Sequence, residues 1–153
     1  MKFILLIILI LFDFLTKKIV FNFIELNNFF PIIPFLDITH IHNYGISFGL
    51  FGGIIPAWII ILSGILIIIF LLNWMMKTNN NLERLGIFFI IAGAISNIGD
   101  RFLNNYVLDF IYFHYNQYYW PAFNFADIYI SFGVLIIIIN TYNLFKARLN
   151  KND

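Results

Sequence analysis

Apolar residues are grouped along the chain into four long blocks, which polar or aromatic segments separate. The blocks cover residues 3–20, 56–76, 85–102 and 127–145, and a helix needs roughly 20 such residues to cross a bilayer. We therefore predict four membrane-spanning helices that belong to one domain over residues 1–153.

The first block follows Lys2 and so has the beginning of a secretory signal peptide. No small-residue cleavage site follows it, and apolar character resumes after Lys18, so we predict an uncleaved span. Asp13 and Lys17 lie four residues apart within it and share one helix face, where an ion pair would lower the cost of burial. A pair that snorkels at the outer helix end is the alternative.

Two longer segments connect the blocks, and both are rich in aromatic residues. Residues 21–55 contain no Lys or Arg, and the run over 35–42 alternates weakly between apolar and polar, which predicts a small β-element. Residues 103–126 combine Tyr and Phe with a Trp120-Pro121 break, so we predict an outer loop or short helix there. The predicted fold class is an all-α membrane protein with this β-element outside the membrane.

The composition agrees with a membrane location, because 61% of the residues are hydrophobic and only 11% are charged, whereas a soluble domain has about 25% charged residues. The net charge of +1 gives no reason to expect nucleic-acid binding. The chain has no Cys, which excludes disulfides and a thiol nucleophile.

The basic residues are distributed unevenly, and this predicts an orientation. Six of the nine Lys and Arg residues lie on one side of a four-span arrangement: Lys2, Lys77, Arg84, Lys146, Arg148 and Lys151. The positive-inside rule places that side, together with both termini, in the cytoplasm. The two connecting segments then lie outside.

Two acids stand in strongly apolar surroundings on the predicted outer side, Asp109 before Phe110 and Asp127 after Ala126. A charged side chain near a bilayer is costly and therefore suggests a function. Two carboxylates about 3 to 5 Å apart share one proton, so that one takes a proton from water while the other polarises a peptide carbonyl, without a metal or cofactor. The alternatives are structural, with Asp127 as the N-cap of the fourth span and Asp109 as a turn residue.

The end of the third block mixes small and polar residues over 92–101. Small residues let a neighbouring backbone approach closely, while Asn97, Asp100 and Arg101 present hydrogen-bonding groups. Helix packing alone is the alternative explanation for the small residues.

Two competing motifs occur in the first connecting segment. Gly45-Ile46-Ser47-Phe48-Gly49 matches the nucleophile-elbow pattern, but that motif requires a large α/β sheet, for which the chain has too few residues outside its spans. His40 and His42 would share a strand face, but no third ligand at diagnostic spacing accompanies them, so we predict no metal site. We assign no role to His114.

Five motifs follow one another in a distinctive order. They are Asp13-Phe14-Leu15-Thr16-Lys17, Asn43-Tyr44-Gly45-Ile46-Ser47-Phe48-Gly49, Gly93-Ala94-Ile95-Ser96-Asn97-Ile98-Gly99-Asp100-Arg101, Val107-Leu108-Asp109-Phe110 and Phe123-Asn124-Phe125-Ala126-Asp127. In this order, over nearly its whole length, the chain resembles lipoprotein signal peptidase (signal peptidase II), a family of bacterial inner-membrane aspartic peptidases. Each motif alone is weak, but five on a four-span frame are specific.

The resemblance implies roles for particular residues. Asp109 and Asp127 match the family's catalytic pair. The positions that surround this pair and contact substrate or support the acids are matched by Asn43, Asn97, Arg101 and Asn124. Further supporting positions are matched by Asp13, Gly93 and Asp100. We interpret Asp100 as structural, paired with Arg101 or with a loop backbone. Small departures from the family pattern occur at Phe14, Ala92, Ser96 and Ile128.

The resemblance also implies the substrate, a prolipoprotein whose Cys carries diacylglycerol and which is cleaved just before that Cys. It implies sensitivity to the cyclic peptide globomycin and a location in the bacterial inner membrane, where lipid surrounds the protein. We expect a monomer without cofactor or metal. The main alternative is a small proton-coupled transporter in which buried acids relay protons, although the two halves show no inverted repeat.

Overall fold

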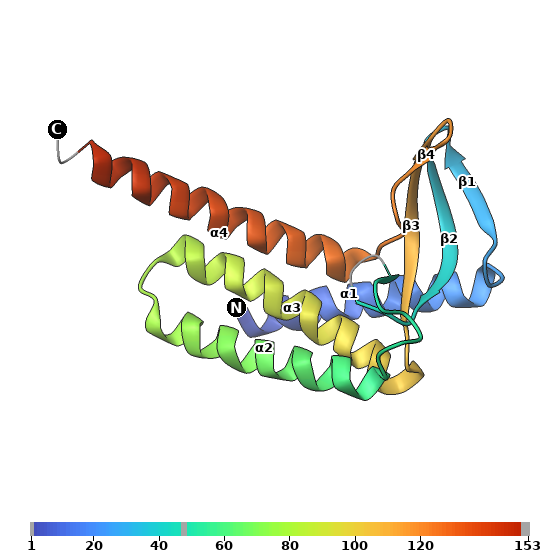
Figure 1. The fold of residues 1–153 in the computed structure, drawn as a ribbon, viewed down its shortest axis with the longest axis horizontal. Coiled ribbons are helices and arrows are strands. Elements are labelled where there is room, and N and C mark those ends of the chain that lie inside the picture. Colours follow the sequence, from blue (N-terminus) through green and yellow to red (C-terminus); the bar gives the residue numbers. More distant parts are fainter. Residues whose placement is uncertain (1, 47–48, 151–153) are drawn as a thin grey trace.

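The computed structural model describes residues 2–46 and 49–150. Its long helices form a bundle, and a small sheet stands at one end of that bundle (Figure 1). The helices are α1 (Lys2–Phe23), α2 (Ala57–Lys77), α3 (Asn81–Asn104) and α4 (Phe125–Leu149). Each helix overlaps one of the four apolar blocks.

Three helices in the described part of the chain, α2, α3 and α4, are long and apolar enough to cross a membrane. Helix α1 has 22 residues but carries Asp13, Lys17 and Lys18 within its apolar stretch. The structure therefore provides three candidate spans, and the fourth predicted span stays a proposal.

The sheet is antiparallel with strand order β1-β2-β3-β4. Its strands are β1 (Phe29–Ile33), β2 (Leu36–Asn43), β3 (Val107–Tyr115) and β4 (Tyr118–Tyr119). The β-element that the weak alternation over residues 35–42 predicted is confirmed by β2.

The prediction of an outer loop or short helix over residues 103–126 is wrong, because this segment supplies β3 and β4. Its β-branched and aromatic residues favour a strand once a partner is available. That partner is β2, and Asp109 lies opposite Ile41 in the pairing. Since β2 comes from the distant first connecting segment, the pairing leaves no local signal in the sequence.

Helix α3 is the central helix, since it packs against α1, α2 and α4. Small residues bring α3 and α4 into close contact. A Cβ atom on Gly93 would collide with the carbonyl oxygen of Ala126, and one on Gly86 would collide with that of Gly133. A larger residue at Gly93 would therefore displace the first turn of α4, which contains Asp127.

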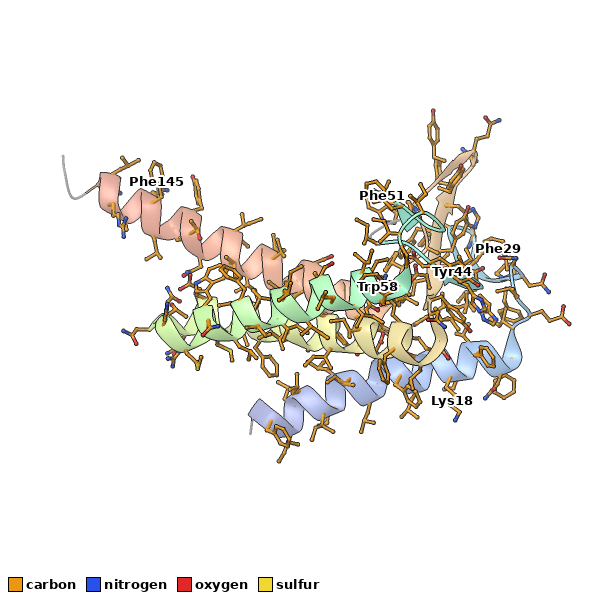
Figure 2. All side chains as sticks on the ribbon, turned by 60° about the horizontal axis from the view of Figure 1, so that its bottom comes forward. Lys18, Phe29, Tyr44, Phe51, Trp58 and Phe145 are labelled. Atoms are coloured by element: carbon orange, nitrogen blue, oxygen red, sulfur yellow. The ribbon has the colours of Figure 1, made fainter. Side chains whose placement is uncertain are left out.

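Large apolar side chains project outward along the helices (Figure 2). Trp58 at the start of α2 is 65% exposed and Phe145 near the end of α4 is 60% exposed. So extensive an apolar surface is unfavourable in water and suits contact with lipid.

Candidate active site

A cavity of about 720 Å³ opens between α2, α3, α4 and the sheet. Most of its walls are aliphatic, with Ile60 and Ile67 on α2 and Ile128 and Leu135 on α4. The polar side chains in the lining are Asn43, Asn97, Arg101, Asp109, Asp127 and Ser131. Five of these six are residues that the sequence predicted for the site.

Asp109 reaches the cavity from the middle of β3 and is 3% exposed. Its Oδ1 accepts a hydrogen bond of 2.6 Å from Asn124 Nδ2, and its Oδ2 accepts one of 2.9 Å from Asn43 Nδ2. The alternative that Asp109 is a turn residue is wrong, because the strand continues on both sides of it.

Asp127 reaches the cavity from the first turn of α4. Its Oδ1 accepts a hydrogen bond of 2.9 Å from Asn97 Nδ2, and its Oδ2 accepts one of 3.1 Å from the Asn124 backbone N–H. The alternative that Asp127 is the N-cap is wrong, because Asn124 occupies that position and Asp127 completes a capping box with it.

Asn124 joins the two acids. Its side chain donates to Asp109 while its backbone donates to Asp127, and the residue has 0% exposure. One rigid helix start therefore holds both carboxylates at the wall of one cavity, although 17 residues separate the two in sequence.

Burial raises the pKa of Asp109 to about 7, since it removes the ionised carboxylate from water. The nearby charge of Asp127 raises the pKa further, while the hydrogen bonds from Asn43 and Asn124 act in the opposite direction. Burial thus outweighs two donated hydrogen bonds, and Asp109 is poised to exchange a proton near neutral pH.

Arg101 connects the third helix to the first connecting segment. Its guanidinium donates a hydrogen bond of 2.6 Å to the Gly45 carbonyl and one of 3.3 Å to the Asn97 carbonyl. Its Nε is buried and has no hydrogen-bond partner among the described residues. Arg101 also lines the cavity that contains the two acids.

Asp13 and Asp100 lie behind the site and do not line the cavity. Both form ion pairs of 2.7 Å with Lys17 Nζ. The predicted pair of Asp13 and Lys17 is confirmed as a buried pair, since the two residues are 1% and 4% exposed, so the snorkelling alternative is wrong. Asp100 is paired with Lys17 and not with Arg101, and it also has a hydrogen bond with the Leu108 backbone.

Lys17 is the site residue that the sequence reasoning missed, because it was considered only as a partner of Asp13. Its Nζ also donates a hydrogen bond of 3.1 Å to Asn97 Oδ1. The available signal was its i,i+4 spacing from Asp13, but no local pattern connects α1 with Asn97 on α3.

His40, His42 and His114 do not line this cavity, whereas Ile46 of the nucleophile-elbow motif does. Ser47 lies outside the described residues. His40 Nε2 lies 3.0 Å from His42 Nε2, and the described residues contain no cluster of three or more side chains able to hold a metal ion. His114 pairs with Asp37 at 3.2 Å.

Comparison with known proteins decides the family, since the family described as Signal peptidase (SPase) II matches residues 5–143. The chain belongs to the signal peptidase II family. It is 41% identical over 133 residues to the lipoprotein signal peptidase of Wigglesworthia glossinidia brevipalpis, which covers 85% of this chain and 86% of that protein. It is 36% identical over 152 residues to that of Acinetobacter baylyi, with 96% and 84% covered.

A solved structure has a similar fold. A bacterial membrane enzyme determined by the in meso method has a TM-score of 0.85 and 31% identity, and the match covers 93% of this chain and 87% of that one. The chain is therefore a membrane peptidase with signal peptidase II function. Nothing in these matches supports the transporter alternative.

Proposed function

We propose that this signal peptidase II is an aspartic endopeptidase whose catalytic pair is Asp109 and Asp127. The observation that carries the proposal is the arrangement at Asn124, which donates one hydrogen bond to each carboxylate at the same cavity wall. Asn43 and Asn97 each add one more donor. Two carboxylates that are held this way and open to one cavity suit acid–base hydrolysis of a peptide bond.

In the proposed reaction the pair holds one proton between its two carboxyl groups. The ionised carboxylate takes a proton from water as the water oxygen attacks the scissile carbonyl carbon, while the protonated carboxyl donates to the carbonyl oxygen. Collapse of the tetrahedral diol then breaks the C–N bond. The carboxyl proton passes to the leaving amine, and the other carboxylate takes a proton from a diol hydroxyl, so that the pair again holds one proton. The raised pKa of Asp109, about 7, keeps such a proton available at neutral pH.

The proposed substrate is a prolipoprotein whose Cys carries diacylglycerol, with cleavage just before that Cys. The aliphatic walls on α2 and α4 suit the acyl chains, and the two acids lie where those walls end at the sheet. Arg101, which lines the same cavity, is suited to hold an extended peptide beside the acids.

The proposed topology has four spans, with α1 as the fourth. Its Asp13 and Lys17 are buried against α3 and α4, so over residues 3–20 the exposed side of α1 carries one charged residue, Lys18. Both termini lie in the cytoplasm, and the sheet and the acids lie on the outer face. The protein acts as a monomer and without a metal.

The test is the cleavage of a diacylglyceryl prolipoprotein by the purified protein in proteoliposomes. Gel mobility measures the rate, and the mass of the released signal peptide identifies the cleaved bond. Wild-type protein cleaves just before the lipidated Cys. Asp109→Asn and Asp127→Asn each lower the rate by more than about a thousandfold, since either change removes a proton-transfer group. Normal processing by a correctly inserted variant of either acid would refute the assignment.

Ser47→Ala is the control for the competing nucleophile-elbow motif. Serine catalysis would lose its nucleophile in this variant, whereas the aspartic mechanism predicts a rate within about twofold of wild type.

A further inference from the structure

Three asparagine side chains present the same end of their amide to the two acids. Asn43 Nδ2 and Asn124 Nδ2 donate to Asp109, and Asn97 Nδ2 donates to Asp127. The two ends of an amide are almost equal in size but opposite in hydrogen-bonding role. Reversal of any one of them would place a carbonyl oxygen against a carboxylate oxygen, so something must hold each amide in its donating orientation.

The group that contacts each amide oxygen provides this control. Asn43 Oδ1 accepts a hydrogen bond of 2.9 Å from the Gly45 backbone N–H, and Asn124 Oδ1 accepts one of 3.1 Å from the Asp127 backbone N–H. Asn97 Oδ1 accepts its hydrogen bond from Lys17 Nζ, at 3.1 Å. A backbone N–H and an ammonium group can only donate, so each fixes the oxygen end of its amide.

We propose that Lys17 is a positioning residue for the peptidase reaction: it holds Asn97 in the one orientation that donates to Asp127. Lys17 is the only side chain among these three fixing groups and is therefore the one that substitution can remove. The inference rests on the proposed catalytic pair for its kinetic readout.

Lys17 is itself fixed. Its ammonium donates a hydrogen bond to Asn97 Oδ1 and forms ion pairs with Asp13 Oδ2 and Asp100 Oδ2, all within 3.1 Å. Asp13 Oδ1 in turn accepts a hydrogen bond of 2.9 Å from the Ala126 N–H in the first turn of α4. The ammonium therefore stands at the junction of α1, α3 and α4, and a buried cation satisfied in this way keeps one position.

The charge of Lys17 has a second consequence for the site. The positive charge lowers the pKa of Asp109, whereas burial and the charge of Asp127 raise it. The other charged groups around Lys17 are Asp13 on its own helix, Asp100 and Arg101 on α3 and Asp127 on α4. Loss of Lys17 therefore raises the pKa of Asp109 and moves the alkaline limb of the pH–rate profile, where the shared proton is lost, to higher pH.

The test compares Lys17→Met with Lys18→Met, which removes the same charge from the adjacent, exposed position of the same helix (Figure 2). We expect Lys17→Met to lower kcat about 10- to 100-fold with KM within about twofold, because a hydrogen bond that supports the pair is lost and no substrate contact is. Lys18→Met leaves both parameters within about twofold. Lys17→Arg, which also only donates, restores part of the rate.

A double-mutant cycle with Asn97→Ala separates positioning from general destabilisation. If Lys17 acts through Asn97, adding Lys17→Met to Asn97→Ala lowers kcat by less than about threefold. If Lys17→Met lowers kcat in the Asn97→Ala variant by the same factor as in wild type, the proposal is overturned. The cycle is also measured with Asp100→Asn present, because Lys17→Met and Asp100→Asn together remove one positive and one negative charge. The net charge of the cluster then equals that of wild type, so the cycle can be measured even where Lys17→Met alone fails to fold.

A measurement without substrate keeps this inference separate from the proposed function. In protein labelled with ¹⁵N asparagine, the side-chain signals of Asn97, identified by their loss in Asn97→Ala, shift or broaden in Lys17→Met and keep their place in Lys18→Met. Unchanged signals in folded Lys17→Met protein overturn the inference. Absence of cleavage by wild-type protein refutes the proposed function and leaves this result standing.

Discussion

Helix α3 has a hydrogen-bonded polar cluster at each end, and the two clusters are built differently. At the start of α3, Asn80 caps the helix by accepting from the backbone N–H groups of Leu82 and Glu83, and its Nδ2 donates to Asn140 Oδ1 at 3.0 Å. Glu83 accepts from Trp74 Nε1 at 3.1 Å and from the Thr78 hydroxyl. No member of this cluster lines the cavity.

At the other end of α3, the donors converge on two acids that do line the cavity. Asp109 and Asp127 together accept four hydrogen bonds, one for each carboxylate oxygen. Both clusters join α3 to α4, so buried polar groups at a helix end do not by themselves indicate a function. The difference lies in the acceptor, because Asp109 and Asp127 line the cavity and Glu83 of the first cluster does not.

The largest difference between the two clusters is expected for Asn124→Ala compared with Asn140→Ala. Asn124→Ala removes a donor to Asp109 and the N-cap of α4, so we expect kcat to fall about 100-fold and stability to fall by about 1 to 2 kcal/mol. Asn140→Ala removes one amide contact with Asn80 and keeps the rate within about twofold. Turnover in proteoliposomes and thermal unfolding in detergent measure both effects.

Equal losses of rate in these two variants would contradict the comparison, because they would show that the two clusters act only through helix packing.

A smaller effect is expected for Asn43→Ala, which removes one donor to Asp109 and leaves the helix caps intact. We expect the rate to fall about tenfold. The hydrogen bond from Asn43 lowers the pKa of Asp109, so its loss moves that pKa further above about 7. The alkaline limb of the pH–rate profile, where the shared proton is lost, then shifts to higher pH.

An alkaline limb that stays in place in Asn43→Ala would show that another group controls it. Glu83→Gln, at the opposite end of α3, is the matched control, because it also removes a hydrogen-bonding partner but lies outside the cavity.

The sequence alone identified the candidate residues of this site much better than it identified the way in which they are held. The motif order selected Asp109, Asp127 and the asparagines, because short motifs keep the residues that carry chemistry. It did not predict β3, since the pairing of β3 with β2 joins segments far apart in the chain. It also predicted that Asp100 pairs with Arg101 or with a loop backbone. Nothing local in the sequence indicates that the side chain of Lys17 on α1 reaches Asp100 on α3.

Stability should respond to pH through Asp109. The pKa of Asp109 is raised from the usual value near 4 to about 7 in the folded protein, so the folded state binds more protons than the unfolded state between these values. The raised pKa of Asp109 therefore contributes its full stabilisation at or below about pH 4. This contribution is lost as pH rises to about 7.

Thermal unfolding of wild type and Asp109→Asn over pH 4 to 8 measures this contribution. The Asn variant cannot ionise, so the difference in unfolding temperature between the two proteins changes across that range. A constant difference would contradict a raised pKa.

The smallest effect on turnover is expected for Glu83→Gln itself. The neutral amide keeps one oxygen for the Trp74 indole N–H but replaces the second carboxylate oxygen with a donor, which faces the Thr78 hydroxyl. It also removes a negative charge from the first turn of α3, where the helix dipole favours one by about 0.3 to 1 kcal/mol. We expect a lower unfolding temperature and a shift in tryptophan fluorescence, with the rate within about twofold of wild type. A loss of turnover as large as that of Asn43→Ala would mean that the start of α3 is coupled to the acids and that the two clusters work as one.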